Sequence, residues 1–135
     1  MALTKVTNSL LDSGALVSKA FGTSSIMIGD DATGTLDAAN YNTGVRVNVL
    51  EDLTSGDNNS ALGFNALANI TTGSDNTAIG RTTLVSTTTG SNNTAVGSIA
   101  LNVNTGDNNT AVGKSALAAN TSGVSHTAVG HQALD

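Results

Sequence analysis

The stretch Thr105-Gly106-Asp107-Asn108-Asn109-Thr110-Ala111-Val112-Gly113, followed by Ala116-Leu117, decides the fold, because close copies of it fill most of the chain. The copies recur at a step of 17 residues, with a single step of 16 between Gly97 and Gly113. A short, nearly constant period is typical of solenoids, in which each coil buries its apolar side only against its neighbours. We therefore expect a repeat solenoid over residues 21–135, built from about seven coils.

A glycine slot marks the same corner of each coil, at residues 29, 46, 63, 80, 97, 113 and 130. Glycine suits a corner that needs positive φ or a close backbone approach. The expected corner glycines are Gly29, Gly63, Gly80, Gly97, Gly113 and Gly130. Arg46 fills the remaining slot, which leaves the geometry of the second coil open. The one-residue deletion falls between Leu101 and Gly106, where we expect a loop, because a strand in register could not absorb it.

Each copy contains a short run that alternates between two faces, as a strand does. The residue before the glycine slot is always a branched aliphatic, and a leucine usually follows five residues later. We expect these two positions to form the core ladder. Its members are Ile28, Val45, Leu62, Ile79, Val96, Val112 and Val129, together with Leu50, Leu67, Leu84, Leu101, Leu117 and Leu134. The small residue within each run, such as Ala95 or Ala111, is expected on the opposite face, against a second surface.

Two further slots have more than one interpretation. Asparagine precedes most of the strands, as in Asn76, Asn93 and Asn109, and suits either turn chemistry, which we favour, or a ligand-binding polar ladder. The Ala-Leu segment after the glycine fits either a second short strand or one helical turn. Handedness does not follow from the pattern.

A single slim coil offers few large apolar side chains, several of its inward positions being Ala or Thr. That burial hardly offsets the entropy lost on ordering the chain. Three chains that share one axis would bury more surface. The expected fold class is therefore all-β, a parallel β-solenoid that forms a tight homo-oligomer, with a homotrimer favoured.

Composition excludes several classes of function. The chain has no Cys, and its net charge of −5 leaves five scattered cations, so nucleic-acid binding is not expected. No apolar run approaches the ~20 residues that span a bilayer, so membrane insertion is not expected either. Residues 1–20 lack the basic and apolar regions of a secretory signal, and we interpret them as an attachment or docking segment.

The residues offer no catalytic set and no cofactor motif, so we expect neither an enzyme nor a cofactor. His126 and His131 would each form a ring of three in a trimer, and a ring facing the axis could hold a metal. The slot of His131 is otherwise filled by residues as different as Phe64, Arg81 and Lys114, which indicates an outward position. We therefore expect no metal site.

The motifs Asn109-Thr110-Ala111-Val112-Gly113 and Asn93-Thr94-Ala95-Val96-Gly97 resemble the head repeats of trimeric autotransporter adhesins. They are still more similar to repeats of phage tail fibres, and the opening Leu3-Thr4-Lys5-Val6-Thr7 resembles the start of tail-fibre and tailspike proteins. The adhesin resemblance implies a left-handed parallel β-roll, assembled as an intertwined homotrimer of three interlocked chains. The departures are Arg46 in a glycine slot and His126 in the last asparagine slot.

The sequence thus predicts a structural tail-fibre segment of a phage virion that supports host attachment. Residues 1–20 would dock on tail or baseplate proteins, and the host surface would contribute a glycan or protein partner. The alternatives are a bacterial trimeric adhesin head and a self-assembling extracellular filament, with an extracellular or cell-surface location. Ice binding by a regular Thr array ranks third, because at least one Thr ladder is expected to point inward. The apolar Val129 and Leu134 of the last copy predict an end that needs a partner and carries no receptor-binding tip.

Overall fold

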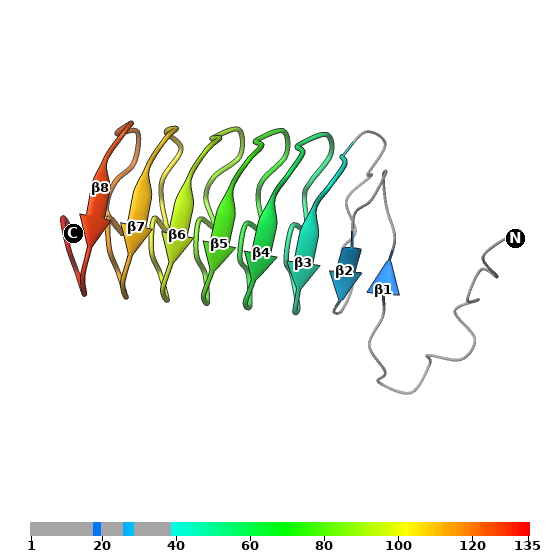
Figure 1. The fold of residues 1–135 in the computed structure, drawn as a ribbon, viewed down its shortest axis with the longest axis horizontal. Helices are drawn as coiled ribbons and strands as arrows, with labels where there is room; N and C mark the ends of the chain where they lie inside the picture. The colour runs from blue at the N-terminus through cyan, green and yellow to red at the C-terminus, as the bar shows by residue number, and fades with distance from the viewer. Residues whose placement is uncertain (1–17, 20–25, 29–38) are drawn as a thin grey trace, which may run out of the picture.

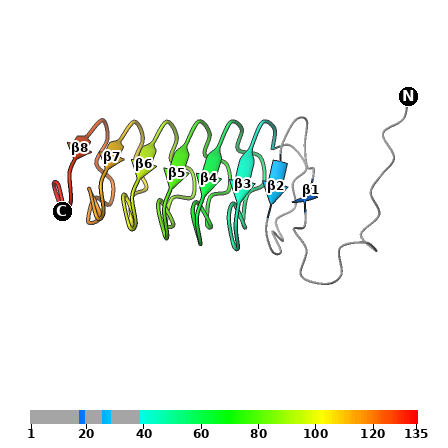
Figure 2. The same cartoon turned by 60° about the horizontal axis from the view of Figure 1, so that its bottom comes forward.

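The computed structural model describes residues 18–19, 26–28 and 39–135. Within this part of the chain, short strands stack into one sheet in sequence order from β1 to β8 (Figure 1). The bounds are β1 Ser18–Lys19, β2 Ile26–Ile28, β3 Thr43–Val45, β4 Ser60–Leu62, β5 Thr77–Ile79, β6 Thr94–Val96, β7 Thr110–Val112 and β8 Thr127–Val129. Figure 2 shows that each strand is one wall of a loop of chain, so the described part is a row of stacked coils.

The strands from β2 to β8 are all parallel and in register, with Thr77 opposite Thr94 and Thr94 opposite Thr110. The expected all-β parallel solenoid is therefore confirmed, over five turns from β3 to β8. The 16-residue step leaves β6 and β7 in register, so the deletion is absorbed outside the strands, as expected. β1 pairs antiparallel with β2, which the repeat pattern did not predict.

The expectation of seven coils extends to residues that the structure does not describe. Residues 20–25 and 29–38, which include Gly29, lie outside the described part. The docking segment 1–20 lies outside it too, except for β1.

The Ala-Leu segment is neither a strand nor a helical turn. Asn65 and Leu67 both have positive φ, 56° and 50°, and the same two slots are left-handed in every coil from β3 onward. Alternating left-handed residues turn the chain sharply while its amides keep pointing along the solenoid axis. The Leu67 N–H donates to Thr83 O of the next coil, and the Thr82 N–H donates to Phe64 O of the previous one. Backbone hydrogen bonds thus continue between coils beyond the strands.

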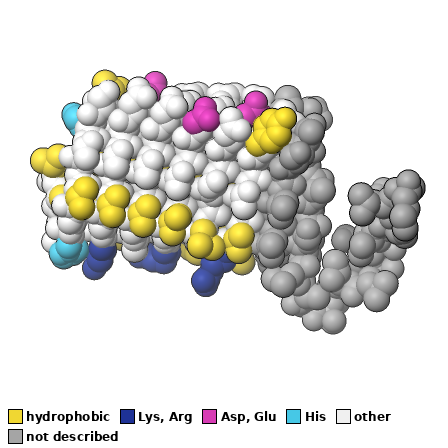
Figure 3. Space-filling model, in the orientation of Figure 1, with side chains coloured by type: hydrophobic (Ala, Val, Ile, Leu, Met, Phe, Trp, Pro, Cys, Tyr) yellow, Lys and Arg dark blue, Asp and Glu magenta, His cyan; other side chains and the backbone are white. Residues whose placement is uncertain are grey.

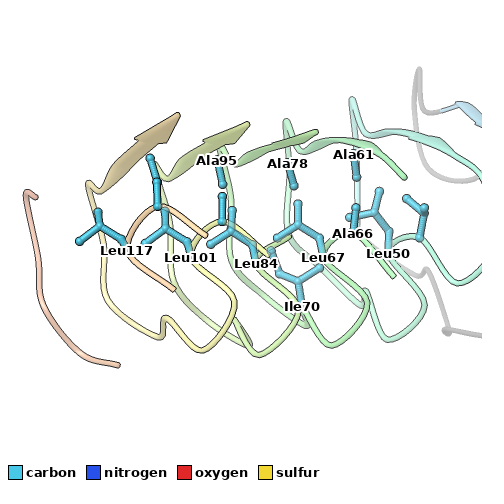
Figure 4. Close-up of a cluster of buried hydrophobic side chains, with 14 of the residues drawn as sticks. Leu50, Ala61, Ala66, Leu67, Ile70, Ala78, Leu84, Ala95, Leu101 and Leu117 are labelled. Carbon is cyan, nitrogen blue, oxygen red and sulfur yellow. The ribbon is translucent and has the colours of Figure 1, made fainter. Parts of the chain in front are cut away.

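The core lies inside the coils, where alanines of the strands meet leucines of the opposite wall (Figure 4). Leu50, Leu67, Leu84, Leu101 and Leu117 are buried, whereas Leu134 in the last coil is 67% exposed. The inward residues of the strand wall are the small ones, such as Ala78, Ala95 and Ala111, each 0% exposed.

The branched aliphatic half of the expected ladder needs a correction, because it lies on the outer face of the strands. Leu62, Ile79, Val112 and Val129 are 48%, 41%, 36% and 70% exposed, and Val45 and Val96 are half-buried. The side chain of Ile28 lies outside the described residues. The physical reason is the width of the coil: leucines from the opposite wall fill the interior and leave room only for a methyl group. On the strand wall, small side chains therefore mark the face that points into the coil.

Enlarging one of these alanines tests the corrected assignment. Ala95→Leu adds atoms to a filled interior and should lower the free energy of unfolding by about 1–3 kcal/mol. Ser98→Ala, on the outer side of the next corner, should change it by less than about 0.5 kcal/mol. Urea denaturation followed by circular dichroism measures both. Equal effects would mean that the faces are assigned wrongly.

The corner glycines are required by conformation and by space. Gly97 has φ 134°, and a Cβ built on it would lie 2.4 Å from the carbonyl oxygen of Gly113 in the next coil. Gly130 has the same conformation, φ 132°, but its nearest contact would be Ala133 Cβ at 3.8 Å. Arg46 adopts this backbone form too, with φ 116°, and β3 still pairs in register with β4. The arginine therefore accepts a strained backbone and does not break the stack.

Substitutions at Gly97 and Gly130 distinguish the cost of backbone strain from the cost of a steric clash with the next coil. Gly130→Ala should cost about 1–3 kcal/mol through its backbone conformation alone. Gly97→Ala adds the clash with Gly113 and should cost at least about 1 kcal/mol more. Thermal unfolding of both variants would show the difference. Identical melting temperatures would contradict the close stacking of coils at this corner.

Candidate interaction surface

The outward side chains of β3–β8 form a flat surface, which we call the strand face. Its first row is hydroxylic and its second row is aliphatic, because strand alternation turns both away from the core. The hydroxylic row consists of Thr43, Ser60, Thr77, Thr94, Thr110 and Thr127. The aliphatic row consists of Val45, Leu62, Ile79, Val96, Val112 and Val129. Thr94 and Thr110 thus point outward, and the expectation that a Thr ladder of the strands points inward is wrong.

The aliphatic row runs along the solenoid as a continuous line, seen in yellow in Figure 3. Parallel register places each of its members directly beside the next, as Ile79 lies beside Val96. Single exposed apolar residues are ordinary, but an unbroken row indicates a contact surface.

Charged residues border the strand face on its two opposite sides. An acidic edge precedes the strands and consists of Asp57, Asp75 and Asp107. A basic edge follows the strands and consists of Arg46, Arg81, Lys114 and His131. Figure 3 shows magenta carboxylates along one margin and dark blue cations along the other, with the aliphatic row between them.

Backbone contacts fix the acidic edge in position. Asp57 Oδ1 accepts a hydrogen bond from the Asn40 N–H at 2.7 Å, and Asp107 Oδ1 accepts one from the Ser91 N–H at 2.8 Å. The Asp75 N–H in turn donates to Asp57 O at 2.9 Å. The carboxylates of Asp57 and Asp107 therefore belong to the turns that stack one coil on the next, and Asp75 joins the same stack through its backbone.

The asparagine slot forms a buried amide ladder. Asn59, Asn76 and Asn93 are each 0% exposed. Asn76 Nδ2 donates to Gly90 O at 2.9 Å, and Asn76 Oδ1 accepts from the Asn93 N–H at 3.0 Å. The second Nδ2 hydrogen bond of Asn76 reaches Asn59 Oδ1 at 3.0 Å. The ladder therefore serves the turns from inside, and its amides are not presented to a ligand.

Removing one amide tests this role. Asn76→Ala leaves the Asn93 N–H and Gly90 O without their side-chain partner inside the coil, which should cost at least about 2 kcal/mol of unfolding free energy. Asn69→Ala, on an exposed position of the same coil, should change stability by less than about 0.5 kcal/mol. Chemical denaturation measures both. A silent Asn76→Ala would contradict the structural role of the ladder.

The two histidines are not brought together. His126 occupies the last position of the asparagine slot, and its backbone N–H donates to Asn109 Oδ1 at 3.0 Å. His131 is exposed on the basic edge, and Figure 3 shows the two cyan side chains well apart. Within the described residues, no group of three His, Cys, Asp or Glu side chains could hold a metal ion.

An open hollow of about 370 Å³ lies at the C-terminal end of the stack. It is lined by Leu117, Ala119, Asn120, His126, Leu134 and Asp135. Leu134 occupies the leucine slot but is 67% exposed, because no coil stacks on it in the structure, whereas Leu117 is 3% exposed. The hollow is thus the unstacked surface of the last coil, and it combines no nucleophile with a base.

Comparison with known proteins yields no relative. No family profile matches the chain, and neither the curated proteins nor the solved structures give a significant match. Among the described residues, no helix is both long and apolar enough to cross a membrane. The strand face with its two charged edges is the candidate functional surface, because it carries an unbroken row of exposed aliphatic side chains.

Proposed function

We propose that the chain is a non-enzymatic structural rod that assembles into a homotrimer and forms a tail-fibre segment of a phage virion. We place the three copies side by side, and not intertwined as the sequence had suggested, because the described strands pair with one another in sequence order within a single chain. The observation that carries this proposal is the unbroken aliphatic row on the outside of the sheet. Each coil adds one apolar side chain to this row, so contact between copies grows with the number of coils. Three copies around one axis would bring their rows together and remove them from water.

Regular stacking suits a mechanical role. Backbone hydrogen bonds link each coil to the next at the strands, at the glycine corner and at the Thr turns, as between Thr71 N and Thr88 O at 2.8 Å. A stack of this kind gives length and stiffness but encloses no pocket between its coils. We assign the tail-fibre role from the Asn-Thr-Ala-Val-Gly repeats and the Leu-Thr-Lys-Val-Thr opening, with residues 1–20 as the part that docks on tail or baseplate proteins. A bacterial adhesin head and a self-assembling filament would use the same rod.

Oligomeric state tests the proposal. The purified chain should have the mass of three copies in light scattering. Val112→Asp should dissociate this assembly, because it places three charges in the apolar contact. Its circular dichroism should remain that of a solenoid, since Val112 lies outside the coil. Ser98→Ala should leave both properties unchanged. A wild-type chain that is folded and monomeric at micromolar concentration would overturn the trimer.

A second function is favoured by one observation, the outward hydroxylic row. Hydroxyls and methyl groups alternate on the strand face as a regular two-dimensional array, with neighbouring strands about 4.8 Å apart. Such an array could order water at an ice surface if the strand face stayed uncovered. Thermal hysteresis of the wild-type chain, measured beside its oligomeric state, separates the two functions. A monomer with hysteresis that Thr94→Lys abolishes would establish ice binding, and a trimer without hysteresis would exclude it.

A further inference from the structure

We propose that the acidic and basic edges are complementary halves of one contact between neighbouring copies, and that they hold the copies parallel and level with one another. This inference rests on the proposed self-assembly through the strand face. It adds the orientation and the axial position of the copies, which the apolar row leaves undetermined.

The charges match in height along the solenoid. Asp75 lies just before β5 and Arg81 just after it. Asp107 and Lys114 flank β7 in the same way. Asp57 precedes β4 and Arg46 follows the neighbouring strand β3, so their heights differ by one coil, about 4.8 Å, which an arginine side chain can span. Each of the three carboxylates therefore has a cation on the opposite edge. That cation lies at the same height as the carboxylate, or one coil away along the solenoid.

Rotational symmetry would bring these matched charges of neighbouring copies into contact. Rotation about an axis parallel to the solenoid keeps every residue at its height and brings the acidic edge of one copy beside the basic edge of the next. Asp75 then faces Arg81 of the neighbouring copy, and Asp107 faces Lys114. In a face-to-face antiparallel pair, with its two-fold axis along the strands, like edges would meet and repel. The charges therefore favour the parallel arrangement and oppose the antiparallel one.

The ion pairs at the edges and the apolar row contribute differently to the contact between copies. Exposed ion pairs contribute little to affinity and are weakened by salt, whereas the apolar row is less sensitive to it. Complementary charges at the margin of an interface select the partner's orientation. Sliding one copy along another by one coil would keep the aliphatic rows in contact but would separate Asp75 from Arg81 and Asp107 from Lys114. The edges thus supply the register that a row of similar aliphatic side chains lacks.

Charge reversal tests the inference on the full chain. Arg81→Glu with Lys114→Glu, or Asp75→Lys with Asp107→Lys, should each raise the dissociation constant of the assembly at least about tenfold at low salt. The effect should shrink in high salt. All four substitutions in one chain restore opposite charges and should lower the constant below that of either reversal. Asp107→Lys also removes the acceptor of the Ser91 N–H, so the fourfold variant is compared with the Asp75→Lys and Asp107→Lys variant, which lacks the same contact. Analytical ultracentrifugation at low and high salt provides the measurement.

A matched control carries the same change in net charge as Asp75→Lys with Asp107→Lys, but on another wall. Glu51→Lys with Asp52→Lys, just after Leu50, should leave the dissociation constant unchanged. A trimer that ignores both edge reversals, or that the fourfold variant fails to restore, would overturn this inference and leave the proposed rod intact. A wild-type monomer would overturn the proposed function itself. The two failures are therefore distinguishable.

Orientation can be read directly, because the chain contains no cysteine. Spin labels on Asn69→Cys and, separately, on Ala119→Cys mark exposed sites in two different coils. Level, parallel copies should give the same label-to-label distance at both sites. Antiparallel copies should give distances that grow with separation from the two-fold axis, and this outcome would overturn the inference.

Discussion

The close stacking of coils through backbone hydrogen bonds is the constraint on which the rest of the structure depends. Each coil must lie one strand spacing from the next around nearly its whole circuit. At the glycine corner this brings Gly113 O to within 2.4 Å of where a Cβ on Gly97 would be. Side chains are therefore excluded from some positions, and residues that turn the chain must accept left-handed conformations. Leu67 and Leu84 do so, with φ 50° and 51°.

Stacking also determines what can fill the interior. The coil is narrow, so one leucine from the turn wall and one alanine from the strand wall fill much of each layer. The amide of asparagine completes the polar side of each layer by bonding to the layers above and below it. A third interior slot changes along the chain from Leu53 and Ile70 to Thr87, Asn104 and Asn120. The apolar core thus becomes more polar toward the C-terminal coils, where Asn120 Nδ2 donates to Asn104 Oδ1 at 2.8 Å.

A surface for association follows from the same geometry. A wall that turns only Asn and Ala inward must turn Thr and Val outward, and register aligns these outward residues into rows. The strand face is therefore a consequence of the repeat, whereas its charged edges are particular to this chain. Only some coils carry Asp at the first edge or Arg and Lys at the second. Irregular charges on a regular row are what would distinguish one register between copies from another.

The sequence alone determined the period, the parallel register, the glycine corners and the burial of the leucines, because these depend on residues that recur at fixed spacing. It also located the deletion outside the strands, since register could not otherwise survive. The sequence did not determine which face of each strand points inward. Alternation gives two faces, one with Thr and Val and the other with Asn and Ala, and hydrophobicity alone favours the wrong one. The tertiary structure decided this point because leucines of the opposite wall already fill the coil, leaving space for Ala78 or Ala95 but not for Ile79 or Val96. The left-handed turns at Asn65 and Leu67 were likewise decided by the need to close each coil within seventeen residues while its amides still reached the coils on either side.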